Sequence, residues 1–202
     1  MRFIVGIDEV GRGPLAGPVA IGIVVCRSLL FIPELTDSKK MTESARAMIA
    51  EKAKEMQKEG SIACGVFSAS AKMIDSDGIE TVIRGLIARG LKELVPDPAT
   101  ADVILDGRLS APKEYRQQTL IGGDMLVPAI SLASVIAKVA RDRYMSTSAH
   151  QKFPQYGFDS HKGYGTASHI AAIREHGPSS FHRMSFLSNI LPERSAASTM
   201  HS

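Results

Sequence analysis

Apolar runs along the chain predict strands, and segments with helical spacing of apolar residues predict helices. The predicted strands cover residues 2–8, 19–26, 62–69, 102–106 and 118–121. The predicted helices cover residues 42–60, 79–94, 128 to about 146, and 166 to about 176. The first strand is apolar on both faces, as is typical of a strand at the centre of a sheet. This mixed order of elements predicts an α/β domain whose mixed central sheet is flanked by helices.

Finer details of the pattern give testable expectations. Thr42 is expected to cap the first helix and Gly60 to end it. The expected inward residues of this helix are Ala45, Met48, Ile49, Ala53 and Met56. Those of the helix over 79–94 are Val82, Ile83, Leu86, Ile87 and Leu91. Residues 153–165 are expected to form a loop because they are rich in glycine and aromatic residues.

Composition limits the class of protein. The 202 residues suffice for one ordinary domain, and 44% hydrophobic with 22% charged residues excludes a disordered or fibrous chain. The longest apolar run, 19–26, is too short to cross a bilayer, and no signal-peptide pattern is seen. Cys26 and Cys64 lie in predicted strands, so we expect buried free thiols and a reducing cytosol. The net charge of +3 is compatible with a polyanionic partner without requiring one.

The first candidate for chemistry is the acidic pair Asp8 and Glu9 at the end of the central strand. Neighbouring strand residues point to opposite faces, so both acids reach one site only if the chain turns at Glu9. The glycines that follow, Gly11 and Gly13, would supply that turn. Alternatively, the two acids simply face solvent at a strand end.

Two further acids lie where α/β proteins place their sites. Asp106 ends a short apolar strand, and Asp124 follows Gly122 and Gly123 before a helix that begins at Pro128. Asp142 is a rival, but it lies fourteen residues into that helix, roughly 21 Å from its start. Asp142 also lies four residues after Lys138, which favours a surface ion pair.

Four acids, Asp8, Glu9, Asp106 and Asp124, form a candidate cluster without histidine or cysteine at metal-binding spacing. Such a donor set suits Mg²⁺ or Mn²⁺ rather than zinc. With two ions about 3.5–4 Å apart, such a site catalyses in-line phosphoryl transfer.

The run from Gly11 to Ala16 also resembles a dinucleotide-binding fingerprint. That fingerprint needs a helix next, whereas Pro18 and a β-branched strand follow here, so we reject it. Residues 153–166 interleave aromatic side chains with His161 and Lys162. This pattern suits contact with a nucleic-acid backbone or sugar, although a rigid surface loop is the alternative.

Together these segments resemble the type 2 ribonucleases H, and specifically bacterial ribonuclease HII. The resemblance is carried, in order, by residues 8–19, the Thr-Asp-Ser-Lys-Lys run 36–40, Asp106-Gly107, Gly123-Asp124 with 133–142, residues 156–166, and 182–186. It implies a ribonuclease H-like domain over 1–150, a small helical C-terminal part over 151–191 that contacts substrate, and a disordered tail over 192–202.

The resemblance implies a metal-dependent endonuclease that hydrolyses RNA paired to DNA and cuts 5′ of single ribonucleotides in duplex DNA, leaving a 3′-hydroxyl and a 5′-phosphate. By motif, Asp8, Glu9, Asp106 and Asp124 match the metal-binding catalytic acids, with two Mg²⁺ or Mn²⁺ ions expected. Gly11, Arg12 and Gly13 match the segment that reads the 2′-hydroxyl, and Tyr164 matches the tyrosine that packs on the sugar at the junction. Lys39, Lys40, Lys162 and Arg183 lie in polar segments of the motifs, so we expect phosphate contacts from them.

The sequence also departs from the family pattern. Residues 76–80 read Ser-Asp-Gly-Ile-Glu where the family usually has Asn-Ile, so no functional role is carried over to them. No peptide for docking a sliding clamp is recognised, and we expect a monomer without an obligate protein partner or a membrane. Two other hypotheses are a hybrid-binding module that lost hydrolysis and a resolvase-like nuclease for DNA alone. The four acids argue against the first, and the 2′-hydroxyl segment with Tyr164 argues against the second.

Overall fold

The computed structural model describes residues 2–27, 30–33, 35, 38 and 40–191. Its strands are β1 (Phe3–Val10), β2 (Val19–Cys26), β3 (Ile62–Ala69), β4 (Ala101–Asp106) and β5 (Arg116–Leu120). Its helices are α1 (Glu43–Lys58), α2 (Ala71–Asp77), α3 (Ile79–Leu94), α4 (Gly123–Leu126), α5 (Pro128–Tyr144), α6 (His150–Lys152), α7 (Phe158–His161) and α8 (Ala167–His176). A π-helical segment, Met145–Ala149, joins α5 to α6, and short 3-10 turns cover Pro98–Thr100, Pro154–Tyr156 and Met184–Phe186.

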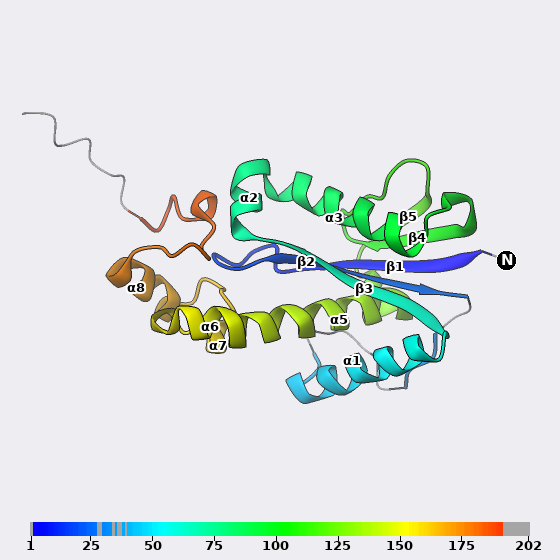
Figure 1. Ribbon diagram of the computed structural model, residues 1–202, viewed down its shortest axis with the longest axis horizontal. Helices are drawn as coiled ribbons and strands as arrows, with labels where there is room; N and C mark the ends of the chain where they lie inside the picture. Colours follow the sequence, from blue (N-terminus) through cyan, green and yellow to red (C-terminus); the bar gives the residue numbers. More distant parts are fainter. Residues whose placement is uncertain (1, 28–29, 34, 36–37, 39, 192–202) are drawn as a thin grey trace, which may run out of the picture.

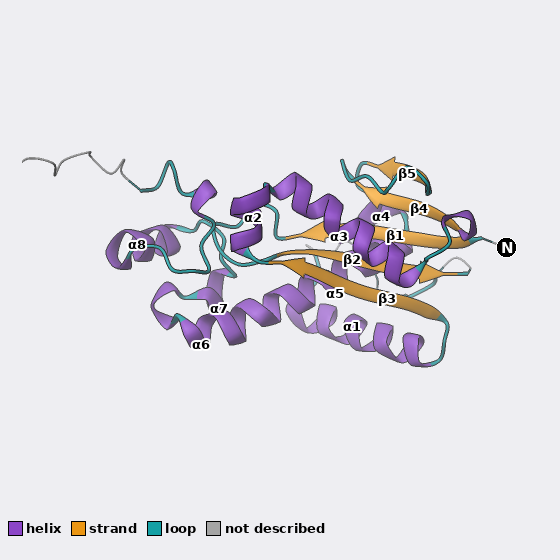
Figure 2. Ribbon diagram, turned by 45° about the horizontal axis from the view of Figure 1, so that its top comes forward, coloured by secondary structure: helices purple, strands orange, loops and turns teal. Residues whose placement is uncertain are grey.

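The five strands form one mixed sheet in the order β3-β2-β1-β4-β5, with β1 at the centre as expected. β1 is antiparallel to β2 and parallel to β4, which leaves the carboxyl ends of β1 and β4 on the same edge. The α2–α3 pair covers one face of the sheet, and α5 with α1 covers the other (Figure 1). The C-terminal helices gather beyond the carboxyl end of β1, so the molecule is elongated (Figure 2). No described helix is long and apolar enough to cross a membrane.

Residue alternation on the strands separates two cores. Val5 and Ile7 pack in the core beneath α3, whereas Val24 and Cys26 pack beneath α1 and α5. Helix α5 lies very close to the sheet: a Cβ added at Gly22 would lie 2.0 Å from the carbonyl oxygen of Ala133. All five inward residues expected for α3 are buried, so that expectation is confirmed.

Two expectations about local structure are wrong, and one helix was not expected. Met48 is 66% exposed and Ala50 is buried in its place, whereas Ile49 and Ala53 are buried as expected, because only this side of the helix faces α5. Residues 153–165 are not a plain loop, since they contain a 3-10 turn and α7. The separate helix α2 was not expected; Ser70 caps it, and Gly78, with a φ of 78°, separates it from α3. The expected tail 192–202 lies outside the described residues.

Both cysteines are free, as expected. Cys26 is buried, but Cys64 is only half-buried because β3 is an edge strand.

Candidate active site

The candidate site lies at the carboxyl ends of the two central parallel strands. Asp8 is near the end of β1, and its side chain is only 6% exposed. It points to the α5 face, like its strand partner Gly22, whose added Cβ would meet Ala133 of α5. Asp106 ends β4 and follows Leu105, which packs in the core beneath α3, so Asp106 shares the α5 face with Asp8.

The chain does not turn at Glu9, contrary to expectation. The chain stays in the strand through Val10, with Glu9 paired to Ile21, and it bends only at Gly11, where φ is 86°. The Glu9 side chain therefore leaves the sheet on the α3 face, opposite Asp8. Pairing with β2 continues two residues past the apolar run, because main-chain hydrogen bonds do not depend on the polarity of the side chain.

The acids near Asp8 interact electrostatically despite this arrangement. Burial raises the pKa of Asp8 to about 7, and the nearby charges of Glu9 and Asp106 add to the increase. A hydrogen bond from Ser134 of α5 opposes the shift, and the Ser134 hydroxyl lies 2.8 Å from that of Ser38. These two serines were not singled out from the sequence, although Ser134 lies within the matched run 133–142.

Asp124 approaches the same place from α4. The N–H of Gly123 donates to an oxygen of Asp106 at 2.7 Å, which places the next residue, Asp124, beside the β4 end. Asp124 is 5% exposed, and its carbonyl accepts a hydrogen bond from the Ser131 hydroxyl of α5. The structure thus brings Asp8, Asp106 and Asp124 to one end of the sheet face that α5 covers.

Asp142, the rival, lies elsewhere on α5. It pairs with Lys138 at 2.9 Å, as expected, but it is 6% exposed rather than at the surface. Its neighbours bury it because α5 is covered on most sides, and eleven of its residues, Asp142 included, are buried.

The donor chemistry of the acid cluster suits a divalent cation. Carboxylate oxygens are the preferred ligands of Mg²⁺ and Mn²⁺, and a cation would offset the burial, and the smaller repulsion from Glu9 and Asp106, that raise the pKa of Asp8. No group of three or more histidine, cysteine or acidic side chains among the described residues is already arranged to hold an ion. The residues present therefore suit a hard cation by chemistry, and their side chains must adjust to share one.

The segment after β1 forms a tight loop over the buried arginines Arg141 and Arg183. Gly11 is buried, whereas Gly13 is exposed, and a Cβ added at Gly13 would meet no atom within 4 Å. The Arg12 side chain is paired with Glu80 of α3 and lies 3.9 Å from Glu9. The departure at residues 76–80 thus supplies a partner for Arg12, which sequence reasoning missed.

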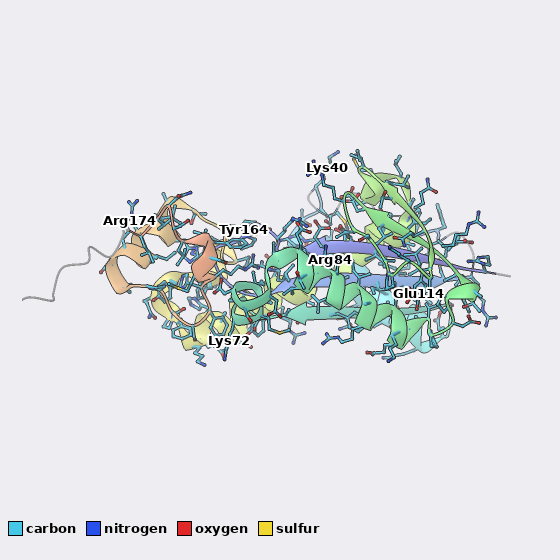
Figure 3. All side chains as sticks on the ribbon, turned by 90° about the horizontal axis from the view of Figure 1, so that it is seen from above. Lys40, Lys72, Arg84, Glu114, Tyr164 and Arg174 are labelled. Carbon is cyan, nitrogen blue, oxygen red and sulfur yellow. The ribbon has the colours of Figure 1, made fainter. Side chains whose placement is uncertain are left out.

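Tyr164 lies beside this loop. The carbonyl of Gly163 accepts hydrogen bonds from Leu15 at 2.9 Å and Ala16 at 3.3 Å, which fixes Tyr164 next to the segment after β1. Tyr164 is 41% exposed, and the side chains of Lys138 and Arg141 each lie 5.7 Å from its ring centre. Figure 3 shows it where the C-terminal part meets the end of the sheet.

The four expected phosphate contacts differ in placement. Lys40 is exposed and lies on the same side of the molecule as Tyr164 in Figure 3. Lys162 is half-buried, has a left-handed φ of 53°, and bonds the carbonyl of Asp159. Arg183 is fully buried, so a direct phosphate contact does not fit its position. Lys39 lies outside the described residues.

Histidines 169 and 182 were also missed by sequence reasoning. Both are buried, their Nε2 atoms lie 3.1 Å apart, and Nδ1 of His169 lies 2.9 Å from the carbonyl of Tyr164. Burial lowers the pKa of each to about 4, so both are neutral at pH 7. They connect the Tyr164 main chain to the segment that carries Arg183.

Comparisons with known proteins identify the family of this chain. The profile of the Ribonuclease HII family matches residues 5–189. A ribonuclease HII of Burkholderia mallei is 43% identical over 185 residues, which cover 92% of this chain and 83% of that protein. One of Burkholderia thailandensis is 42% identical with the same coverage.

Solved structures share the fold. Ribonuclease H2 of Pyrococcus horikoshii superposes with a TM-score of 0.71 at 21% identity, covering 91% of this chain and 93% of that one. Ribonuclease HII of Archaeoglobus fulgidus, solved as a complex with PCNA, gives 0.71 at 23% identity, covering 90% and 94%. Bst-RNase HIII, solved in complex with Mn²⁺, gives 0.66 at 19% identity, covering 92% and 67%.

Proposed function

This chain belongs to the ribonuclease HII family and is therefore an endoribonuclease, and we propose that it cuts at single ribonucleotides in duplex DNA as well as within RNA–DNA hybrids. The observation that carries the proposal is the proximity of two features at the end of β1. Asp8 and Glu9, which interact electrostatically with each other and lie near Asp106, are followed directly by the loop of residues 11–18, whose Gly13 is exposed and which contacts the Tyr164 segment. Chemistry and recognition of the sugar would thus share one edge of the sheet.

The reaction proposed is hydrolysis on the 5′ side of the ribonucleotide. Water adds to phosphorus and the bond to the 3′-oxygen breaks, which leaves a 3′-hydroxyl and a 5′-phosphate. We propose that Asp8, Asp106 and Asp124 hold two divalent ions together with Glu9, whose side chain must turn around the end of β1 from the α3 face to reach them. Such ions, when bound, stabilise charge on the attacking and leaving oxygens. The protein's own part is to hold the carboxylates at the strand ends, with Asp106 anchored by the Gly123 N–H.

Recognition is proposed to depend on the sugar rather than the base. The 2′-hydroxyl both donates and accepts a hydrogen bond, and it alone distinguishes one ribonucleotide from its neighbours. Main-chain groups at Gly11, Arg12 and Gly13 are held in place, and the open space at Gly13 allows close approach of the sugar. Tyr164 would pack on the adjacent deoxyribose.

The deciding experiment is a cleavage assay on three duplexes of one sequence: all DNA, one ribonucleotide, and a continuous RNA–DNA hybrid. We expect cleavage of the second and third with Mg²⁺ or Mn²⁺, none with chelator, and none of the all-DNA duplex. Cleavage of the all-DNA duplex would support the resolvase-like alternative. Binding of the hybrid without cleavage in any metal would support the binding-module alternative.

Asp124→Asn tests the choice of the fourth acid. We expect loss of cleavage at millimolar metal, because an amide cannot supply the negative charge that a hard cation prefers. Asp142→Asn is the matched control, since Asp142 is equally buried and acidic but pairs with Lys138. It should keep a sizeable fraction of the activity, with any loss of stability followed by thermal unfolding. Full activity in the Asp124 variant contradicts the assignment.

Tyr164→Ala tests the junction role. We expect a larger loss of rate on the one-ribonucleotide duplex than on the continuous hybrid, because only the former presents a deoxyribose beside the ribose. Tyr144→Ala is the control, since Tyr144 is also 41% exposed but packs on Phe181. An equal loss on both substrates means that the Tyr164 ring is merely structural.

Lys40 and Lys162 are proposed to contact phosphates, and the same is proposed for Lys39 from the sequence alone. Removal of a true contact should reduce the salt dependence of binding by about one unit of slope. Lys72→Ala is the control, because Lys72 lies on the other side of the molecule in Figure 3. Unchanged slopes in all three alanine variants exclude this binding surface.

A further inference from the structure

Two arginines are buried beneath the loop of residues 11–18, and neither forms an ion pair with a carboxylate of the described residues. Arg141 is 2% exposed and Arg183 is fully buried. Among the described residues, every hydrogen bond from these guanidinium groups ends on a main-chain carbonyl. Desolvation of a charge is costly, so a fold that buries two neighbouring cations must use them to hold something in place.

Arg183 holds both the start of the loop and two points in its second half. Its Nη2 donates to the carbonyl of Gly11 at 2.6 Å, its Nη1 to that of Arg12 at 2.9 Å, and its Nε to that of Gly17 at 3.0 Å. Its own N–H donates to the carbonyl of Leu15 at 2.8 Å. All three guanidinium nitrogens are thus occupied by the loop.

Arg141 holds the second half and connects it to the Tyr164 segment. Its Nε donates to Pro18 at 2.9 Å, its Nη2 to Ala16 at 3.2 Å, and its Nη1 to Lys162 at 3.1 Å. The same guanidinium lies under the ring of Tyr164. The two arginines therefore set the spacing between the loop and Tyr164.

The bonds to Arg183 also determine which way two amides face. In a trans peptide the N–H points opposite to the C=O, and the described chain has no cis peptide. Because the carbonyls of Gly11 and Arg12 point at Arg183, the N–H groups of Arg12 and Gly13 point away from it. Neither N–H has a hydrogen-bond partner within the part of the chain that the structure describes. A charge-assisted bond at each carbonyl also polarises the peptide, which strengthens its N–H as a donor.

We propose that Arg183 is a positioning residue for ribose recognition, which aims the N–H groups of Arg12 and Gly13 outward as a fixed pair of donors for the 2′-hydroxyl. The proposal rests on the proposed function and assigns Arg183 a role in discrimination, not in binding of phosphate. Arg141 supports it by fixing the opposite side of the loop. Lysine cannot replace the arginine, because one ammonium group cannot span the carbonyls of Gly11, Arg12 and Gly17 with the geometry of a planar fork.

The test compares binding of the one-ribonucleotide duplex and the all-DNA duplex, with chelator present to prevent cleavage. Fluorescence anisotropy of labelled duplexes gives the two Kd values and their ratio. We expect Arg183→Lys to reduce that ratio about tenfold, while the Kd for all-DNA duplex changes less than twofold. Arg174→Lys is the matched control, because Arg174 is exposed on α8 at the outer end of the C-terminal part in Figure 3. A folded Arg183→Lys protein with the wild-type ratio overturns the proposal.

A milder variant covers the case in which Arg183→Lys does not fold. Asp75 accepts hydrogen bonds from the N–H groups of Met184 and Ser185 at 2.9 and 3.0 Å, directly after Arg183. Asp75→Ala loosens this segment without touching the loop, so we expect a two- to fivefold fall in the ratio. An unchanged ratio overturns the proposal.

Amide NMR of the wild-type protein gives a reading that does not depend on any variant. We expect the one-ribonucleotide duplex to shift the Arg12 and Gly13 amide signals and slow their hydrogen exchange, and the all-DNA duplex to do neither. An equal response to both duplexes overturns the proposal even if the protein cleaves at ribonucleotides. If wild-type protein with Mg²⁺ fails to cleave at the ribonucleotide, the proposed function itself has failed.

Discussion

Gly13→Val gives the cleanest test of sugar recognition at the loop after β1. A Cβ at Gly13 meets no protein atom within 4 Å, and the residue is exposed. The folded chain therefore accommodates a larger side chain, and we expect the free energy of unfolding to change by less than about 1 kcal/mol. A ribose that approaches this main chain would meet the added isopropyl group.

The expected loss of activity can be estimated from the contacts that would be blocked. Two neutral hydrogen bonds to the 2′-hydroxyl, at about 1 kcal/mol each, correspond to about 30-fold in kcat/KM. Steric exclusion of the sugar adds to this, so about 30-fold is a lower limit. The measurement is kcat/KM on the one-ribonucleotide duplex, with thermal unfolding of the same preparation.

Gly11→Ala shows why the choice of glycine matters. Gly11 has a φ of 86°, and a Cβ there would lie 2.2 Å from Nε of Arg141. The left-handed conformation alone costs roughly 1–2 kcal/mol for a residue with a side chain. This variant should lose stability and activity together, whereas Gly13→Val should lose activity alone. Wild-type kcat/KM in a stably folded Gly13→Val protein would refute the reasoning.

Two further predictions concern stability. Gly22→Ala should lower the free energy of unfolding by about 1–3 kcal/mol, because its Cβ would lie 2.0 Å from the carbonyl oxygen of Ala133. Gly85→Ala should raise the free energy of unfolding by about 0.5–1 kcal/mol, because Gly85 lies in the exposed middle of α3 with open space around it. Chemical denaturation measures both changes. His169 and His182 have folded-state pKa values near 4, below the usual 6.5. Their contribution to the free energy of unfolding is therefore complete above pH 6.5 and is lost as the pH falls toward 4. For one histidine the loss is about 3 kcal/mol. His169→Gln should therefore flatten the decline in stability between pH 6.5 and 4, and an unchanged slope would contradict the buried neutral network.

The parts of the fold that were predictable are those where a local pattern coincides with burial. β2 and β3 have the predicted bounds, because both are mostly apolar runs, broken in β3 only by Gly65 and Ser68, and α3 has its predicted inward face. The prediction for Met48 was wrong because helical spacing identifies an apolar stripe but not how wide a part of it is buried, and α1 turns Ala50 inward instead. The prediction of a turn at Glu9 was wrong because pairing with β2 prolongs the strand, and no local sequence pattern reveals this pairing.

The charged residues of the site show a second limit of sequence reasoning. A cation in a polar segment is expected at the surface, since burial of a charge is costly. Arg183 is buried nevertheless, because distant carbonyls at Gly11, Arg12 and Gly17 meet its donors. Asp142 likewise has the predicted partner, Lys138, in an unpredicted environment. A charged residue in a motif is indicated as a functional candidate, but its role depends on contacts with residues that are distant in the sequence.

The placement of the acids and the arginines implies that the proposed recognition of the ribose can be perturbed separately from cleavage. Asp8 lies in the paired part of β1, held by its partners in the sheet and by Ser134 of α5. The loop begins three residues later, where pairing has ended, and its shape depends on Arg183 from the C-terminal part. A change at Arg183 can therefore shift the loop while β1 and its carboxylates stay in place. We therefore expect an Arg183 variant to lose discrimination between the one-ribonucleotide duplex and the all-DNA duplex while the acid cluster keeps its arrangement.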